Sequence, residues 1–483
     1  MRVEELIEYL NQTISDQSLA KLKEYDFEID KKTNYPVVKN QYIFQLKPTS
    51  KGDFEKNDGF KKELFSAGIL SVKKTCRCNS NLKLIETNNI DDYSSLTEFI
   101  NRSNLQIGGY EAYIILDGYY YQIIGSQPNI IIGNPDPDDP PPPPPRKDAE
   151  YSIPHRDQYL PLRESFLRGA KAHKQNLPDS AVVAILDSGI DLRYFEDIIP
   201  LNFYNAICGA EVNDCNICDK SLKNKAYGWS FIDEYASRVF PNNPYDDDLS
   251  HKHGTRIAKI IANVTQNNVR IMPLKTADYA GIHQYFDIYC AFEYILNYNK
   301  TRINLKDKVK IINASWGFYS NHSLPILDKY IEKLKDEQIY LVTSAGNDGL
   351  DISQYIYYPA AYSRAVTENF VYTVTSVKEI EEGRYTAQDF GLNYSELYVD
   401  AGVVADNEGG YKDPLNPNVG GPRIKGTSYA AAYFTGFLAE QMSNPNYNDN
   451  IAELKDGDFQ AFAALGVRGQ NNRDNNWIVT TNE

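Results

Sequence analysis

Three short apolar segments in the second half of the chain constrain its fold most strongly. They lie at residues 182–186, 309–313 and 340–343, and each is rich in β-branched or aromatic residues and flanked by stretches of helical character. Apolar strands that alternate with helices are typical of a parallel sheet buried on both faces. The sequence therefore predicts an α/β domain with a mostly parallel sheet flanked by helices.

A polar residue follows shortly after each of these segments. Asp187 follows the first segment, Ser315 lies just past the second and Asn347 just past the third. The carboxyl ends of parallel strands meet at one edge of a sheet, and sheets of this type bind ligands there. We therefore expect the three side chains to lie close together in one site.

Three glycine-containing motifs supply an acid, an imidazole and a hydroxyl in that order along the chain. They are Asp187-Ser188-Gly189, His253-Gly254-Thr255 and Gly426-Thr427-Ser428. A carboxylate that accepts the Nδ1–H of a histidine holds the imidazole in the tautomer that a general base needs. Taken singly, the motifs have ordinary structural explanations: a turn residue, a surface histidine and a helix N-cap. Together they predict a serine nucleophile with its base and the orienting acid.

The order Asp, His, Ser and the run that begins at Gly426-Thr427-Ser428 resemble the subtilase family of serine peptidases, over roughly residues 160–465. The resemblance implies that Ser428 is the nucleophile, His253 the general base and Asp187 its orienting acid. In the family the base directly precedes Gly-Thr. This favours His253 over the neighbouring His251, which we expect to be a bystander.

The resemblance also implies an oxyanion donor and a substrate cleft. Asn347 would donate its side-chain amide to the oxyanion, with the Ser428 backbone N–H as second donor; an Asn-Asp-Gly turn is the alternative explanation. Two segments would hold an extended peptide: Ser315, Trp316 and Gly317 through their backbone, and Ser344, Ala345 and Gly346 as the wall of the first specificity pocket. Trp316 is bulkier than the residue expected there, so we hypothesise that it narrows or covers a pocket.

The chain departs from the family pattern at several positions. Ala432 stands where proline is usual, Lys259 stands where glycine is usual, and the segment after residue 263 is too short for the common calcium loop. No cofactor is required by the expected chemistry. The cluster Asp246-Asp247-Asp248 offers oxygen ligands for calcium, but a calcium site needs several oxygens that converge in space, so no calcium is assigned. Tyr358-Pro359 resembles a family segment with a cis peptide bond, so a cis bond is predicted here.

A smaller unit is expected at residues 1–125. Its predicted elements have the order β-α-β-β-α-β, with strands at 41–46, 69–75, 82–86 and 112–116 and helices at 60–67 and 94–101. This is a split βαβ arrangement. Subtilase propeptides share this topology and this place in the chain. The resemblance therefore implies a propeptide-like α+β domain that serves as an intramolecular chaperone or inhibitor. A target-recognition module is the alternative.

Residues 126–160 form the expected linker between the two units. They contain six consecutive prolines at 140–145, which favour an extended polyproline II spacer without internal hydrogen bonds. A ligand for proline-binding domains is the alternative, and an exposed segment of this kind also suits autoprocessing. The predicted division is thus 1–125, 126–160 and a peptidase-like domain at 161–483.

Composition limits the partners and the compartment. A formal net charge of −15 and a pI near 5.0 argue against nucleic acid or an anionic membrane surface as the main partner. The sequence has no run of about 18 apolar residues and does not begin like a secretory signal. We therefore expect a cytoplasmic protein without nucleic acid or a membrane as partner, and the resemblance to subtilases implies a protein or peptide substrate.

Six cysteines are too few for a disulfide scaffold of this length. Cys208, Cys215 and Cys218 lie close together, which leaves three readings: a zinc site, a local disulfide or unpaired thiols. Unpaired thiols are expected in a reducing compartment.

Two functional alternatives to a peptidase also stay open: a catalytically silent peptide-binding protein on the same scaffold, and acyl transfer to an amine.

Overall fold

The computed structural model describes most of the larger domain and part of the smaller one. The described residues are 27–29, 36–38, 40–45, 47–48, 69–79, 81–87, 106–107, 110–111, 117–118, 180–195, 228–232, 247, 252–266, 268–277, 283–319, 325–347, 352–353, 356–363, 370–381, 384–387, 398–405, 410–416, 423–443 and 477–480. The expected linker at 126–160 lies outside them, so the division into domains stays a prediction.

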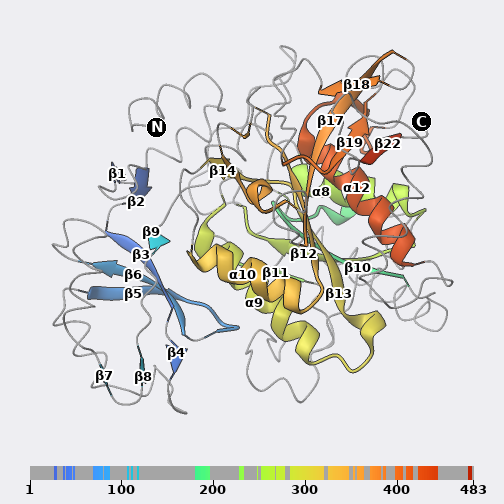
Figure 1. Ribbon diagram of the computed structural model, residues 1–483. Coiled ribbons are helices and arrows are strands. Elements are labelled where there is room, and N and C mark those ends of the chain that lie inside the picture. The colour runs from blue at the N-terminus through green and yellow to red at the C-terminus, as the bar shows by residue number, and fades with distance from the viewer. Residues whose placement is uncertain are drawn as a thin grey trace.

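A nine-stranded sheet forms the centre of the larger domain (Figure 1). Its main path has the order β11-β12-β10-β13-β15-β17-β19-β22, and every neighbouring pair along this path is parallel. The ninth strand, β18, pairs antiparallel with β17. The strands are β10 (Val182–Asp187), β11 (Trp229–Ser230), β12 (Arg270–Lys275), β13 (Val309–Ala314), β15 (Tyr340–Ser344), β17 (Val371–Glu381), β18 (Arg384–Ala387), β19 (Ala401–Val404) and β22 (Trp477–Thr480). The predicted parallel sheet is confirmed.

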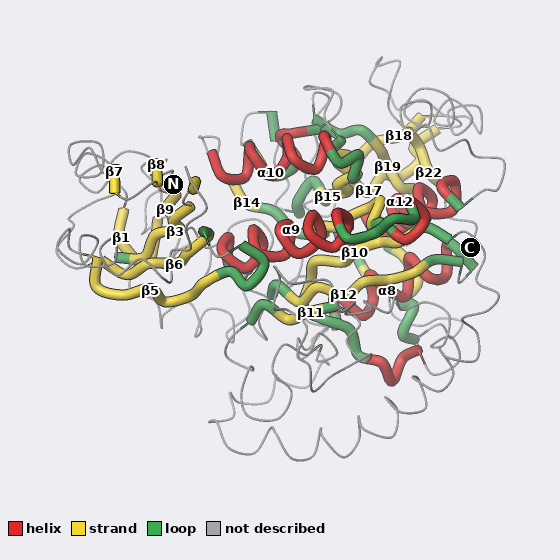
Figure 2. The backbone as a smooth tube through the Cα atoms, turned by 90° about the horizontal axis from the view of Figure 1, so that it is seen from below, coloured by secondary structure: helices red, strands yellow, loops and turns green. Residues whose placement is uncertain are grey.

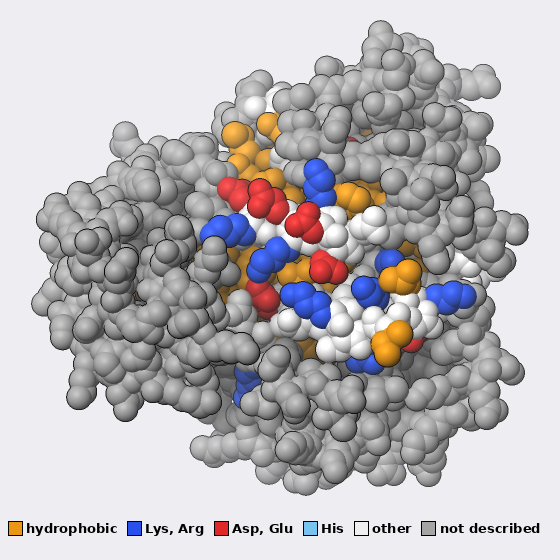
Figure 3. Space-filling view, turned by 60° about the horizontal axis from the view of Figure 1, so that its bottom comes forward, with side chains coloured by type: hydrophobic (Ala, Val, Ile, Leu, Met, Phe, Trp, Pro, Cys, Tyr) orange, Lys and Arg blue, Asp and Glu red, His pale blue; other side chains and the backbone are white. Residues whose placement is uncertain are grey.

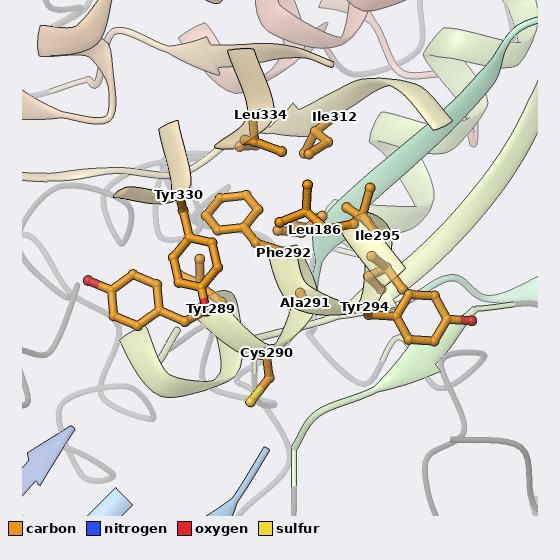
Figure 4. Packing of buried hydrophobic residues seen from close by; sticks show 14 of the residues in the cluster. Leu186, Tyr289, Cys290, Ala291, Phe292, Tyr294, Ile295, Ile312, Tyr330 and Leu334 are labelled. Atoms are coloured by element: carbon orange, nitrogen blue, oxygen red, sulfur yellow. The ribbon is translucent and has the colours of Figure 1, made fainter. Parts of the chain in front are cut away.

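Helices cover both faces of this sheet. Helices α9 (Tyr285–Lys300) and α10 (Pro325–Asp336) pack on one face, and α8 (His253–Val264) and α12 (Thr427–Met442) pack on the other. The side chains of β10 alternate between the two resulting cores, because successive residues of a strand point to opposite faces. Figure 4 shows Phe292 and Leu334 directed toward Leu186 and Ile312 in the first core.

Smaller elements complete the larger domain. They are the two-stranded sheets β14 (Phe318–Tyr319) with β16 (Tyr357–Tyr358) and β20 (Tyr411–Lys412) with β21 (Arg423–Ile424), and the 3₁₀ helices η2 (Leu192–Phe195), η5 (Leu305–Asp307) and η6 (Ala360–Tyr362). The peptide bond between Tyr358 and Pro359 is cis, as predicted. No helix within the described ranges is both long and apolar enough to cross a membrane.

The smaller unit contains a four-stranded antiparallel sheet. Its strands are β3 (Gln41–Gln45), β5 (Ile69–Thr75), β6 (Leu82–Thr87) and β9 (Asp117–Gly118), in the order β5-β6-β3-β9. This is the strand order of a split βαβ arrangement. The fourth strand pairs at Asp117–Gly118, while the expected strand at 112–116 and both expected helices lie outside the described residues. A propeptide-like role for this unit therefore stays a prediction.

Short strands accompany this sheet. They are β1 (Phe27–Ile29), β2 (Pro36–Val38), β4 (Lys47–Pro48), β7 (Gln106–Ile107) and β8 (Tyr110–Glu111).

The hairpin of β5 and β6 packs against α9 of the larger domain, as Figures 1 and 2 both show. On the face seen in Figure 3, acidic and basic side chains of the described residues lie intermixed.

Candidate active site

The carboxyl ends of three neighbouring strands form the edge that carries the site. Strands β10, β13 and β15 are adjacent in the sheet and run parallel. Asp187 ends β10, Ser315 directly follows β13, and Asn347 lies three residues after β15. All three side chains are buried. The sheet topology thus gathers the three polar residues along one edge, as expected.

Asp187 and His253 are in direct contact. Nδ1 of His253 lies 2.8 Å from Oδ1 and 3.0 Å from Oδ2 of Asp187, and the backbone N–H of Ser188 donates to Oδ1 at 2.7 Å. Burial raises the pKa of Asp187, but the charge of His253 and its hydrogen bond hold that pKa below its ordinary value. An ionised Asp187 assigns the Nδ1–H tautomer to His253, which leaves Nε2 as the acceptor.

His253 Nε2 is buried and has no hydrogen-bond partner among the described residues. Its ring lies 5.6 Å, centroid to centroid, from the ring of Tyr429, the residue after Ser428. The start of α12 therefore lies beside the histidine. An unsatisfied buried nitrogen costs free energy unless another group supplies a proton to it. This arrangement suits a general base, because Nε2 is available to accept a proton.

Ser428 lies at the second position of α12, after Gly426, whose φ of 137° favours glycine. Its hydroxyl donates to the carbonyl oxygen of Ser315 at 3.0 Å, and the Ser315 hydroxyl lies 3.0 Å from the carbonyl oxygen of Ser428. The structure thus brings Ser428 to the edge but does not join its hydroxyl to His253. A rotation about the Cα–Cβ bond of Ser428 is needed to direct Oγ elsewhere.

Asn347 is oriented by the residue before Ser428. Its Oδ1 accepts from the backbone N–H of Thr427 at 2.8 Å and from the Thr427 hydroxyl at 2.9 Å. Because two donors face Oδ1, the amide nitrogen Nδ2 must face the other way. This Nδ2 is buried without a partner in the described part of the chain, and a Cβ on Gly426 would lie 3.2 Å from it. The amide is therefore a preoriented donor next to Ser428.

The six residues expected to hold substrate are all buried in the structure. Ser315 and Trp316 are buried, and so are Gly317 and the segment 344–346. The backbone N–H of Ala345 already donates to Val374, and the carbonyl oxygen of Trp316 accepts from Thr343. These two backbone groups are thus satisfied within the domain. A Cβ on Gly317 would come within 2.4 Å of the Tyr357 ring, so this glycine is required for packing.

The indole of Trp316 is 1% exposed and belongs to the core on the α9 side of the sheet. Its ring centroid lies 5.5 Å from that of His283, and its Nε1 has no hydrogen-bond partner within the described ranges. Since the side chain is packed inside the domain, it can limit the depth of a neighbouring pocket but does not project over one. The effect of Trp316 on substrate choice stays a hypothesis.

Residues 179–461 match the model of the subtilase family, also described as peptidase S8. The chain belongs to the subtilase family. The matched region contains Asp187, His253, Asn347 and Ser428. The chain is also 24% identical, over an alignment of 306 residues, to subtilisin-like protease 1 of Plasmodium berghei (strain Anka). That alignment covers 56% of this chain and 44% of the relative, so the chain spans less than half the length of that protein.

Several solved structures are similar to this chain, at low sequence identity. The epidermin leader peptide processing serine protease of Staphylococcus aureus is 16% identical with a TM-score of 0.45, covering 83% of this chain and 88% of that one. The A subunit of the AB5 toxin from E. coli is 18% identical with a TM-score of 0.43, covering 66% and 94%. A structure of the subtilase cytotoxin SubAB assembly is 20% identical with a TM-score of 0.41, covering 60% and 83%.

Sequence reasoning missed a second buried carboxylate in this subtilase domain. Asp247 Oδ1 lies 2.9 Å from the Ser188 hydroxyl, and Oδ2 accepts from the backbone N–H of Thr255 at 2.9 Å and from the Thr255 hydroxyl. The Ser188 hydroxyl also lies 3.2 Å from Asp187 and accepts from the Gly254 N–H at 3.0 Å. Asp247 thus ties the start of α8 to the loop after β10, and so fixes His253 relative to Asp187.

The acidic cluster Asp246-Asp247-Asp248 is the sequence signal for this residue, but the pattern alone suggests calcium ligands and not a structural carboxylate. Both carboxylate oxygens of Asp247 are occupied by hydrogen bonds from the protein. The part of the chain that the structure describes contains no cluster of three or more acidic, histidine or cysteine side chains arranged to hold a metal. Asp246 and Asp248 lie outside the described residues, as do Cys208, Cys215 and Cys218. Calcium and zinc therefore stay untested.

Replacement of Asp247 by alanine should leave the backbone N–H and the hydroxyl of Thr255 buried without their acceptor. We expect the free energy of unfolding to fall by about 1–3 kcal/mol or more, since each unsatisfied group costs roughly that amount. Urea denaturation measures this. The matched control is Asp307→Ala, which breaks a partly exposed pair with Arg270 and should cost no more than about 1 kcal/mol. Equal losses in the two variants would contradict this role of Asp247.

His283 should make the stability depend on pH. Burial lowers its pKa to about 3, although the charge of Asp187 opposes the shift. Between about pH 6.5, its ordinary pKa, and about pH 3, the unfolded chain binds a proton that the folded chain does not, so stability falls as the pH falls. The slope from this group approaches about 1.4 kcal/mol per pH unit. We expect a shallower slope for His283→Gln in urea denaturation between about pH 7 and about pH 4; parallel curves would contradict it.

Proposed function

We propose that this subtilase is a serine endopeptidase that hydrolyses peptide bonds in protein or peptide substrates. The observation that carries the proposal is the buried pair of Asp187 and His253, joined at 2.8 Å, with Nε2 of His253 unpartnered within the described ranges and the ring of Tyr429, the residue after Ser428, 5.6 Å from the imidazole. A carboxylate, an imidazole of fixed tautomer and a hydroxyl at a helix start are the parts that acyl transfer requires.

In the proposed reaction Ser428 first turns its hydroxyl from the Ser315 carbonyl toward His253. Oγ then attacks the carbonyl carbon of the scissile peptide, and Nε2 of His253 takes the proton. Asp187 stabilises the imidazolium that forms, without taking the proton itself. His253 next gives the proton to the leaving amine, and the same base activates a water molecule that hydrolyses the acyl-enzyme.

The oxyanion of the tetrahedral intermediate would be stabilised by two donors. One is Nδ2 of Asn347, which is held in place because its Oδ1 is bound by Thr427. The other is the backbone N–H of Ser428, which lies in the first turn of α12, where no intrahelical acceptor exists. Donors that are fixed before the reaction need no reorganisation when the charge develops, and this is why they lower the barrier.

The substrate would lie as an extended segment along the edge formed by residues 315–317 and 344–346. Such a mode uses backbone hydrogen bonds for affinity and pockets for alternate side chains. Trp316 would set the depth of one of these pockets, since its indole is buried in the wall.

The smaller N-terminal unit would act as an intramolecular chaperone and inhibitor, with the chain cut in or near residues 126–160. The packing of its β5–β6 hairpin on α9 supports a stable association with the subtilase domain. We further propose that the protein works in the cytoplasm without a required cofactor, with neither nucleic acid nor a membrane as partner.

Replacement of single site residues should separate their roles in peptide hydrolysis. Ser428→Ala removes the nucleophile and should lower kcat by roughly 10⁶-fold. Asn347→Ala removes one oxyanion donor and should lower kcat by roughly 10²–10³-fold with little change in KM, the size known for such a donor in subtilisin. His253→Ala should resemble Ser428→Ala, whereas the control His251→Ala should keep full activity. Hydrolysis that persists in Ser428→Ala, or a wild type without activity, would remove the proposal.

Replacement of Trp316 by leucine should enlarge the neighbouring pocket. We expect the preference for residues upstream of the cleaved bond to shift toward larger side chains, with kcat/KM for the best small residue falling by about 10-fold, because one or a few methylene groups in an apolar pocket are worth about 1–3 kcal/mol. Cleavage profiling of a peptide library measures this. An unchanged profile in a folded variant would exclude Trp316 as a determinant.

Deletion of residues 1–125 distinguishes a propeptide-like unit from a recognition module. A propeptide-like unit predicts that the remainder fails to reach an active fold on its own and gains activity when residues 1–125 are supplied as a separate chain. A recognition module predicts the opposite: an active remainder with altered substrate choice. Activity and circular dichroism of both preparations decide between the two.

A further inference from the structure

Three buried cysteines meet where the β5–β6 hairpin packs against α9. Cys76 and Cys78 lie in the turn of the hairpin, and Cys290 lies near the middle of α9. They are 2%, 8% and 4% exposed, carry reduced thiols and belong to one hydrophobic cluster. Two units far apart in the sequence thus place cysteines in the same interface, and the proposed peptidase chemistry uses none of them.

Polar contacts fix how the hairpin lies along α9. Lys74 pairs with Asp287 at 3.3 Å, and Nδ2 of Asn79 donates to Glu293 at 3.2 Å. On α9, Cys290 lies three residues after Asp287 and three before Glu293, so the three share one face of the helix.

The same contacts place Cys76 opposite Cys290. Along the hairpin, Cys76 lies between Lys74 and Asn79, which bind the residues on either side of Cys290. A further bond, from Asn297 to the carbonyl oxygen of Cys78 at 2.8 Å, holds the turn in place. In Figure 4 the sulfur of Cys290 points away from Leu186 and Ile312, on the side where the N-terminal strands lie.

The thiols affect one another's ionisation. Burial opposes ionisation of Cys76, but hydrogen bonding with the Cys290 and Cys78 thiols lowers its pKa. Burial and the neighbouring Cys76 raise the pKa of Cys290. A thiol that ionises readily beside a protonated one is the usual arrangement of a pair that oxidises to a disulfide.

We propose that Cys76 and Cys290 are a redox-sensitive pair, and that their oxidation to a disulfide ties the N-terminal unit covalently to helix α9. With hydrogen peroxide as oxidant, the Cys76 thiolate attacks one peroxide oxygen, the O–O bond breaks, and Cys76 becomes a sulfenic acid as hydroxide leaves. The Cys290 sulfur then attacks the Cys76 sulfur, the S–S bond forms as the S–O bond of the sulfenic acid breaks, and the hydroxyl leaves as water with the proton of the Cys290 thiol. Two thiols lose two electrons in total, and one peroxide is reduced to two waters.

The disulfide would be a covalent link across the interface between the N-terminal unit and α9. This consequence rests on the proposed function of the N-terminal unit as an inhibitor that is cut from the subtilase domain. After such a cut the oxidised unit would stay attached, whereas reduction would leave it held by noncovalent contacts alone. Formation of this disulfide requires no peptidase activity, so it can be tested in a variant that cannot cleave itself.

The experiment uses the full chain with Ser428→Ala, treated with hydrogen peroxide, then unfolded in urea so that buried thiols are accessible, blocked with N-ethylmaleimide and digested with trypsin without reductant. Trypsin cuts after Arg77 and so separates Cys76, in the peptide 75–77, from Cys78, in the peptide 78–83. Cys290 lies in the peptide 276–300. We expect a species in which 75–77 is linked to 276–300, which disappears on reduction, together with loss of maleimide labelling at Cys76 and Cys290.

A link between 75–77 and 78–83, irreversible oxidation of Cys76, or full maleimide labelling of Cys76 and Cys290 after peroxide would each overturn the proposal. The Cys78→Ser variant is the matched control, because it removes a neighbouring thiol and should keep the link. Cys290→Ser should abolish it.

A second readout uses wild-type chains that are oxidised and cut between the two units by an added protease. In denaturing electrophoresis without reductant they should migrate as one species, whereas the Cys290→Ser variant should migrate as two species. Two species in both would also overturn the proposal.

Discussion

The buried carboxylate of Asp187 is the charge around which the site is arranged. A carboxylate removed from water costs several kcal/mol unless charged or hydrogen-bonding partners replace the solvent. Asp187 is 3% exposed, and its partners are the imidazole of His253 and the backbone N–H of Ser188. These partners lie on α8 and on the loop after β10. The contacts that keep the acid ionised therefore also hold α8 at the edge of the sheet, and Asp247 reinforces the same junction.

The position of Ser428 depends on how closely α12 approaches the sheet. Residues 430–432 are fully buried alanines, and at Gly436 a Cβ would lie 2.7 Å from that of Val264 on α8. Small side chains thus let two helices and a sheet pack without intervening bulk. One polar contact sets the helix against the strands, because Asn313 of β13 donates to the hydroxyl of Thr435 at 2.9 Å. Apolar packing brings α12 close to the sheet. The hydrogen bond fixes the position of α12 along its axis, and so determines where its first turn meets the edge of the sheet.

Local sequence patterns predicted the parts of the fold that depend on local chemistry. The strand at 69–75 has the predicted bounds, the parallel sheet follows from its apolar strands, and the cis bond before Pro359 is present. Two of the departures from the family pattern are compatible with the packing: Lys259 extends to the carbonyl oxygen of Tyr194 at 3.1 Å, and Ala432 is buried in the core.

What the sequence could not predict are contacts between segments that are not adjacent in the chain. Asp247 meets Thr255 and Ser188 only in the folded chain, the Ser428 hydroxyl is bound to Ser315, and the hairpin of β5 and β6 meets α9 across more than 200 residues. No periodicity or motif encodes such pairings.

The central claim is that His253 activates the hydroxyl of Ser428 for attack on an electrophile. It is tested most directly by reaction of the folded protein with a fluorophosphonate, followed by mass spectrometric location of the adduct. The account predicts one adduct, on Ser428, and its loss in His253→Ala although the serine is retained, because the hydroxyl then lacks the base that accepts its proton. An unmodified Ser428 in folded wild-type protein, or equal labelling of wild type and His253→Ala, would contradict it.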